Sequence, residues 1–198
     1  MSDFVTKVVG PQDWPVVGEL FEPKGLVENC WCTYFRMTAK ERSACGTAER
    51  RDALRDLVVG GERVGVLGLV DGRPVGWIGV GPRPGFARLE RSRAAKLLKG
   101  DDPERIWSVV CLYLARDQRH QGNVRLLVDR AVQWAREEKA DLIEAYPEDD
   151  RADRADRVDG GAVERSSFHG RVSTFESCGF TVIEPRLQHR ALVRKDLR

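Results

Sequence analysis

The sequence has no long apolar run and almost no net charge. Its 198 residues hold 33 Lys+Arg and 31 Asp+Glu, which gives a formal net charge of +2. No global electrostatic field would therefore attract nucleic acid or an anionic membrane. The apolar run Val64–Val70 ends at Asp71, well short of the roughly 20 residues that span a bilayer. We expect neither a nucleic-acid partner nor a membrane partner.

Cysteine is scarce and odd in number, with five residues. The segment Met1–Phe4 lacks the basic and apolar regions of a secretory signal. An odd count without such a signal favours reduced thiols and a cytoplasmic location. Cys30 and Cys32 form a C-x-C pair with no second Cys/His pair nearby, so we expect no metal site.

The composition is that of a folded protein, with 41% hydrophobic and 32% charged residues. Such a balance excludes a wholly disordered chain. A chain of this length buries about 70% of its unfolded surface, so it needs no disulfide or metal to fold. We expect one domain over residues 1–198.

Local signals in the N-terminal part predict short elements and one hairpin. Thr38 and Glu41 have the Thr-x-x-Glu form of a capping box, so a helix is expected to begin there. Asp71-Gly72, a pair favoured in type I′ turns, joins two apolar runs and predicts a β-hairpin. The other expected elements are a strand over Phe4–Val9, a helix over Pro11–Phe21, a helix from Thr47 to Gly60, and hairpin strands over Arg63–Val70 and Arg73–Val80.

The C-terminal part contains a strand-helix-strand unit. Ile106–Ala115 is an almost continuous apolar run, which predicts a central strand buried on both faces. Gly122–Lys139 carries apolar residues at helical spacing, and Asp141–Tyr146 is a second strand. The two strands are expected to be parallel with a right-handed crossover. A helix over Gly170–Ser177 and strands over Phe180–Ile183 and Arg190–Val193 are expected to follow.

The junction between the central strand and its helix is rich in groups that bind anions. A helix N-terminus carries about four unpaired N–H groups and a partial positive charge. Gly122 lets a ligand approach the backbone because glycine has no Cβ. Arg116, Arg119, His120 and Arg125 add positive or hydrogen-bonding side chains. The junction is therefore either a phosphate-binding loop or an ordinary turn with solvated arginines.

Two motifs, in order along the chain, resemble those of a known superfamily. Arg119-x-x-Gly122-x-Val124 after an apolar strand is similar to the pyrophosphate loop of the GNAT N-acetyltransferases. Phe175, four residues before Gly179-Phe180, resembles the second signature of that superfamily. The sequences Trp107–Cys111 and Glu144–Pro147 also resemble a bacterial branch of it. The resemblance covers residues 62–185 by motif and the first 60 residues only by element order.

The resemblance implies an α/β fold, with a mixed, mostly antiparallel sheet of six to seven strands flanked by about four helices. Residues 1–60 would form the acceptor side and residues 62–185 the cofactor-binding core. Acetyl-CoA would enter where the two strands of the strand-helix-strand unit diverge, its pantetheine on the central strand and its pyrophosphate on backbone amides. The implied cofactor-binding residues are Leu112, Leu114, Arg119, His120, Gln121, Gly122, Asn123, Val124 and Arg125.

Three residues depart from the family pattern. Val124 stands where glycine or alanine is usual. Phe175 replaces the frequent tyrosine that protonates the departing CoA thiolate, and Phe168 replaces an asparagine. The implied activity is transfer of an acetyl group from acetyl-CoA to a primary amine of a small molecule or peptide by direct attack. The alternative is a non-catalytic acyl-CoA-binding or regulatory domain. A homodimer formed by pairing of sheets is compatible with either function.

Two residues near the end of the second strand are candidates for proton transfer. Glu144, an acid within an apolar strand, is either a general base acting through water or a solvent-facing or arginine-paired side chain. Tyr146 is either a proton donor or a packing aromatic. In the N-terminal part, Trp31, Tyr34 and Phe35 either line the acceptor site or pack in the core. Structural roles are expected for His169 and His189, and a solvated surface for the acidic stretch Glu148–Arg165.

Overall fold

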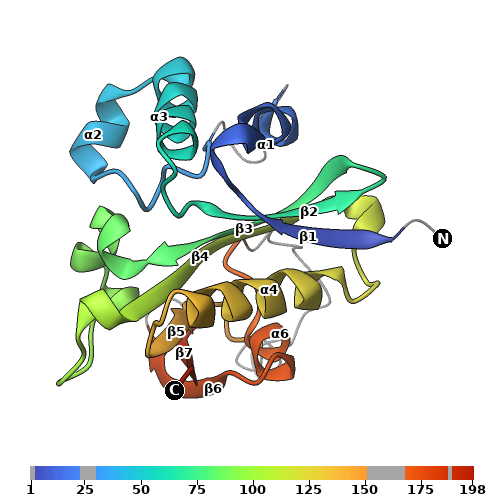
Figure 1. The fold of residues 1–198 in the computed structure, drawn as a ribbon. Coiled ribbons are helices and arrows are strands. Elements are labelled where there is room, and N and C mark those ends of the chain that lie inside the picture. The colour runs from blue at the N-terminus through green and yellow to red at the C-terminus, as the bar shows by residue number, and fades with distance from the viewer. Residues whose placement is uncertain (1–2, 23–29, 151–167, 187–188) are drawn as a thin grey trace, which may run out of the picture.

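The computed structural model describes residues 3–22, 30–150, 168–186 and 189–198. A seven-stranded sheet with strand order β1-β2-β3-β4-β5-β7-β6 separates two groups of helices. Helices α1, α2 and α3 lie on one face, and α4 and α6 lie on the other (Figure 1). The strands are β1 Phe4–Val8, β2 Gly65–Val70, β3 Arg73–Pro82, β4 Ile106–Leu114, β5 Leu142–Ala145, β6 Thr181–Arg186 and β7 Arg190–Asp196. The α-helices are α1 Trp14–Phe21, α2 Ala39–Ala44, α3 Thr47–Val59, α4 Asn123–Glu137 and α6 Val172–Ser177.

This architecture confirms the expected fold class. Of the strand pairs, β4 and β5 are parallel, whereas the pairs on either side of them are antiparallel. The described residues contain five α-helices, which is the number expected from the local signals and one more than the resemblance implies. None of the helices in these ranges is long and apolar enough to cross a membrane.

The local signals produce the structures they predict. Thr38 accepts a hydrogen bond from the amide of Glu41, and the Glu41 side chain accepts one from the amide of Thr38, which completes the capping box of α2. Asp71 and Gly72 both have positive φ angles, 50° and 78°, as a type I′ turn requires. The turn joins β2 to β3 in antiparallel register.

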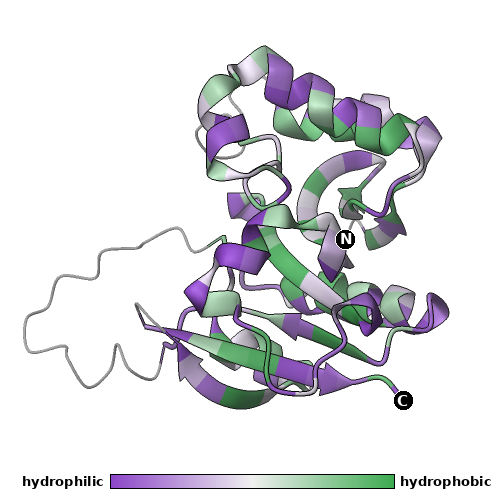
Figure 2. Cartoon of the chain, turned by 90° about the vertical axis from the view of Figure 1, so that its left-hand side faces the viewer, coloured by the Kyte–Doolittle hydropathy of each residue, from purple (hydrophilic) through white to green (hydrophobic). Residues whose placement is uncertain are grey.

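The sheet packs a core on each face. Helix α4 buries Leu127, Val128, Ala131 and Ala135 against the central strands because these residues share one face of the helix. A second core lies under α1 and α3 and includes Trp77. In Figure 2 the central strands are largely hydrophobic, and hydrophilic residues run along the helices that flank them. Strand β4 is fourth of seven in the sheet, as expected of its apolar run.

Strand β4 is irregular at Val110. Cys111 pairs with Gly79 and Val109 with Val80, so Val110 is an extra residue that forms a β-bulge. The parallel pairing of β4 with β5 ends at the adjacent position, where Val109 pairs with Ala145. Beyond this point the two strands are no longer paired, and residues 110–114 keep a partner strand only on the β3 side. The bulge therefore lies where the sheet opens.

Candidate active site

The free edge of β4 is the first component of the site. The amide of Leu112 points away from β3 and donates a hydrogen bond of 2.7 Å to the carbonyl oxygen of Phe168. Because backbone groups alternate in direction along a strand, the amide of Leu114 points the same way. The two residues expected to pair with pantetheine thus lie on one edge, and the amide of Leu112 already has a partner within this chain.

The β4–α4 loop is the second component. His120 and Gly122 have positive φ angles of 62° and 82°, and with them the chain turns from the end of β4 into α4. Gly122 is the N-cap residue and offers no side-chain acceptor to the helix. A Cβ added to it would meet no atom within 4 Å, so the surface above it is open. The amide of Arg125 donates to the carbonyl of Gly122 over 2.9 Å, so the amides before it at the start of this 15-residue helix are the candidate anion-binding groups.

Several side chains of this loop form hydrogen bonds to the backbone of the loop and of the adjoining end of β4. Arg119 Nε donates to the carbonyl of Leu114 over 3.1 Å, and Gln121 Nε2 donates to that of Asp117 over 2.8 Å. Asn123 is buried, and its Nδ2 donates to the carbonyl of Gln118 over 3.1 Å. These three predicted residues hold the loop in shape, so the backbone of the loop is the candidate element for binding an anion.

The remaining side chains of the predicted cofactor set lie at the surface or in the core. His120 and Arg125 are exposed. Arg125 is 3.5 Å from the carboxylate of Asp129, one turn along α4. Val124 is half-buried and packs against the core between α4 and the sheet. Its side chain therefore does not cover the approach to the loop.

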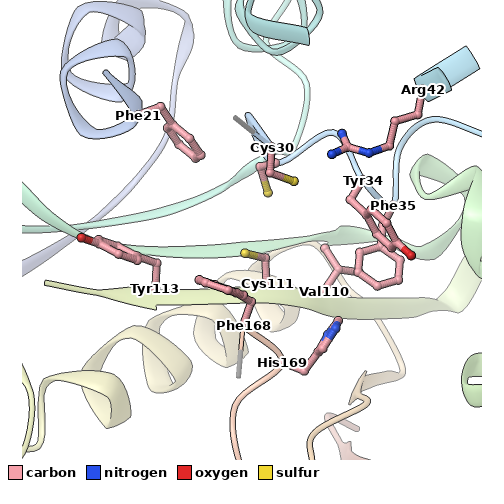
Figure 3. Close-up of a pocket in the computed structure, with 11 residues that line it drawn as sticks. Phe21, Cys30, Tyr34, Phe35, Arg42, Val110, Cys111, Tyr113, Phe168 and His169 are labelled. Carbon is pink, nitrogen blue, oxygen red and sulfur yellow. The ribbon is translucent and has the colours of Figure 1, made fainter. Parts of the chain in front are cut away.

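An apolar pocket lies on the α1–α3 side of the sheet, next to the bulge. Its volume is about 190 Å³. The side chains around it come from the end of α1, from α2 and the segment before it, from β4 and from the segment before α6 (Figure 3). It is lined by Phe21, Cys30, Cys32, Tyr34, Phe35, Arg42, Val110, Cys111, Tyr113, Phe168 and His169.

The aromatic segment before α2 divides between this pocket and the core. Tyr34 and Phe35 line the pocket. Trp31 instead lies in the core, where its ring stacks on Phe21 at 5.6 Å and faces Trp14 at 6.2 Å. Of the two alternatives raised by the sequence, packing in the core applies to Trp31, and lining of a pocket applies to Tyr34 and Phe35.

Two thiols meet at the base of the pocket. Cys111 and Cys32 are hydrogen-bonded, and this contact together with burial raises the pKa of Cys111 well above its usual value. Cys32 also accepts a hydrogen bond from Trp77 Nε1 over 3.2 Å. Cys111 is therefore a neutral thiol near pH 7 and not an activated nucleophile.

His169 is a pocket residue for which the sequence predicted only a structural role. Its side chain is hydrogen-bonded to the backbone of Val110 and lies edge-on to Phe35 at 5.6 Å. Burial, with the positive charge of Arg190, lowers the pKa of His169 to about 4. The imidazole is therefore neutral near pH 7, with one nitrogen donating to the backbone of Val110 and the other unprotonated. No local sequence signal marks it, because its neighbours in space are distant in sequence.

Glu144 and Tyr146 form part of a buried polar network away from this pocket. Glu144 is 1% exposed and is paired with Arg83 on one side and with Arg194, at 2.8 Å, on the other. The Tyr146 hydroxyl donates to Glu144 over 2.5 Å and accepts from Arg83 over 2.6 Å. Arg194 is also bound to Asp101 at 2.5 Å. For Glu144 this geometry favours the arginine-paired alternative.

Burial and the negative charge of Glu144 raise the pKa of Tyr146 well above its usual value. The phenol therefore stays protonated at any physiological pH. Ser108 Oγ, 3.2 Å from the Tyr146 hydroxyl, joins β4 to the same network. The network thus ties β4, β5 and β7 together just before the sheet opens.

Residues of α6 do not reach the pocket. Phe175 is fully buried and packs edge-on against Phe180 at 5.1 Å. Ser173 is exposed and bonds Asp150. Most of the acidic stretch Glu148–Arg165 lies outside the described residues. Within the described ranges, no group of three or more His, Cys, Asp or Glu side chains is placed to hold a metal ion.

A central strand that separates from its parallel neighbour and leads into a glycine-started helix is the arrangement that the resemblance to the GNAT superfamily implies. The Acetyltransferase (GNAT) family matches residues 28–157, and the chain belongs to this family. The comparison with curated proteins gives no match.

Solved structures share the fold over almost the whole chain. A GNAT-family protein from Desulfovibrio desulfuricans is 16% identical, with a TM-score of 0.54 and coverage of 99% of this chain and 100% of that one. YncA from Salmonella typhimurium, solved with acetyl-CoA, is 14% identical, with a TM-score of 0.55 and coverage of 100% and 95%. Diaminobutyrate acetyltransferase EctA from Paenibacillus lautus, solved with its substrate and coenzyme A, is 12% identical, with a TM-score of 0.52 and coverage of 99% and 96%.

Proposed function

We propose that this acetyltransferase moves the acetyl group of acetyl-CoA to a primary amine by direct attack. One observation supports this most: the edge of β4 that is not paired with β5 after Val109 leads, through the short turn Arg116–Gln118, to the Gly122 N-cap of α4. The apolar pocket borders the same stretch of β4 at Val110 and Cys111. A donor held along the edge and an amine held in the pocket would therefore meet at the bulge.

The cofactor part of the proposal uses backbone groups. The pyrophosphate would bind the first amides of α4, where the helix dipole favours negative charge. The pantetheine would lie along the free edge of β4 at Leu114 and Leu112. At Leu112 it would replace the carbonyl of Phe168, which now accepts the hydrogen bond. Acetyl-CoA supplies the thioester that the amine attacks.

The chemical step forms a C–N bond and breaks the C–S bond of the thioester. The amine must be neutral to attack, and its nitrogen becomes acidic once it is bonded to the carbonyl carbon. We assign His169 as the acceptor of that proton, because its neutral ring lines the pocket beside Val110. The proton finally neutralises the CoA thiolate through solvent, since Phe175 is a buried hydrocarbon.

Glu144 and Tyr146 receive a positioning role in this proposal. Their contacts are with Arg83, Arg194 and Ser108, and none of these groups lines the pocket. By joining β5 to β4 and β7, they would fix the position from which the two strands diverge. Precise placement of donor and acceptor supplies much of the rate of such a transfer.

The alternative function, a non-catalytic acyl-CoA-binding domain, is favoured by the absence of a proton donor at Phe175. Incubation with acetyl-CoA and a panel of primary amines separates the two. We expect a product heavier than the amine by one acetyl group, detected by mass spectrometry, and one equivalent of free CoA. Saturable acetyl-CoA binding with no product from any amine would favour the alternative.

A further inference from the structure

The described wall of the pocket contains one formal charge, and that charge is positive. Arg42 reaches it from α2, while the other lining side chains are aromatic, aliphatic, thiol or imidazole. His169 stays neutral near pH 7 because burial lowers its pKa to about 4. Figure 3 shows Arg42 on the same side of the pocket as Tyr34 and Phe35.

Arg42 retains most of its hydrogen-bonding capacity. Its Nη1 is 3.4 Å from the Thr33 hydroxyl, and its guanidinium carbon lies 5.5 Å from the centre of the Tyr34 ring. Among the ion pairs of the described residues, none includes Arg42. A guanidinium has five N–H donors in a planar fork that matches a carboxylate. It therefore has donors to offer an anionic ligand.

A second arginine strengthens the positive charge at this rim. The guanidinium of Arg88 lies 4.0 Å from the centre of the Tyr34 ring, and it too has no acidic partner in the described ranges. Two cations against one aromatic ring attract an anion and disfavour a second ammonium group on the acceptor. Polyamines and other polycationic amines are poor matches for this wall.

The cavity itself is small and apolar. Its volume of about 190 Å³ lies below the roughly 300–1,000 Å³ typical of pockets for drug-sized ligands. Phe21, Phe35 and Phe168 give it hydrocarbon walls. It can hold one aromatic or branched aliphatic group, whose burial supplies binding free energy.

We infer that the acceptor is a free amino acid with an apolar side chain. The side chain occupies the cavity, the carboxylate pairs with Arg42, and the α-amine faces His169 and the donor at the bulge. This inference rests on the proposed function, because it names the substrate class of the same site. It differs from that function in depending on Arg42, which takes no part in binding acetyl-CoA.

The test compares ligands with and without the carboxylate. Binding of L-phenylalanine, phenethylamine and spermidine is measured by calorimetry in the presence of CoA, and product formation with acetyl-CoA is measured by mass spectrometry. We expect L-phenylalanine to bind best and to be acetylated. In Arg42→Gln its binding should be about tenfold to a hundredfold weaker, the loss expected for a hydrogen-bonded charge pair. Phenethylamine binding should be unchanged.

Lys40→Gln is the matched control, since it removes the same charge from an exposed position two residues away on α2. It should bind L-phenylalanine like the parent protein, and Arg42→Lys should recover part of the loss. Acetylation of spermidine or phenethylamine in preference to L-phenylalanine would overturn the inference and leave the proposed function standing. L-Phenylalanine binding that depends on Arg42, without turnover of any amine, would support the carboxylate contact with Arg42 but contradict the proposed function, and with it the role of the amino acid as acceptor.

Discussion

The amide of Leu112 donates its hydrogen bond to the carbonyl of Phe168, across the gap where β4 and β5 separate. This bond closes the strand edge that we propose for pantetheine. Phe168 also lines the pocket proposed for the acceptor. A single segment, residues 168–170, therefore borders both halves of the site, and its geometry should affect donor and acceptor alike.

We expect Gly122→Glu to abolish acetyl-CoA binding without unfolding the protein. The new side chain puts a negative charge at the helix N-terminus and forces a non-glycine residue to φ +82°, at a cost of about 1–2 kcal/mol. Loss of the charge-assisted hydrogen bonds to the pyrophosphate should weaken binding by about a hundredfold or more. Calorimetric titration with acetyl-CoA measures this, with circular dichroism to confirm folding.

Gly100→Glu is the control for Gly122→Glu. Gly100 also has a positive φ angle, +92°, and open space where a Cβ would lie, but it belongs to the β3–β4 connection. This variant should carry the same backbone strain and keep its acetyl-CoA affinity. Unchanged affinity in a folded Gly122→Glu protein would contradict the assignment of the loop.

Replacement of Glu144 by glutamine should destabilise the fold. The change leaves Arg83 and Arg194 buried with one carboxylate fewer between them, and loss of one partner from a buried ion pair costs about 3–5 kcal/mol. Urea unfolding measures the loss, and Tyr146→Phe, which removes one hydroxyl from the same network, should cost less. Unchanged stability together with loss of turnover would instead identify Glu144 as the general base.

His169 should make stability depend on pH. Its folded-state pKa of about 4 lies below the unfolded value of about 6.5, so between these values the unfolded chain binds more protons. The contribution of His169 is therefore complete above about pH 6.5 and is lost as pH falls toward 4, by up to about 1.4 kcal/mol per pH unit. The free energy of unfolding should change less between pH 6.5 and pH 5.5 in His169→Gln than in the parent protein. An equal difference in both proteins would contradict the lowered pKa.

Gly170→Ala tests the segment that borders both halves of the site. Gly170 has φ +72°, and a Cβ there would lie 2.9 Å from a methyl of Leu112 and 3.0 Å from the Phe175 ring. This overpacking should cost about 1–3 kcal/mol and weaken acetyl-CoA binding. Gly179→Ala has the same strained backbone, φ +80°, but its closest contact is the flexible end of Lys195. Equal stability of the two variants would show that residues 168–170 shift to accommodate the added methyl group, which would contradict the expected overpacking.

The sequence predicts those parts of the fold that local chemistry decides. The Thr38–Glu41 capping box, the Asp71-Gly72 turn and the strand-helix-strand unit around Gly122 each depend on residues close together in the chain. Their signals are therefore complete within a short window, and the structure forms all three.

The sequence does not predict contacts that join distant segments. Glu144 meets Arg83 and Arg194, which are 61 and 50 residues away, so its ion pairs have no local signature. Trp31 enters the core while Tyr34 lines the pocket, because positive φ angles at Trp31 and Cys32 break any strand or helix period. The placement of His169 in the pocket depends on the bulge at Val110, and that bulge is apparent only from the pairing register of β3 and β4.

Titration of the purified protein with acetyl-CoA in a calorimeter, at two salt concentrations, tests the central claim most directly. We predict saturable micromolar binding that weakens at higher salt, because the β4–α4 loop holds the pyrophosphate through charge. No binding to a folded sample would contradict the assignment of β4 and Gly122 as the cofactor site.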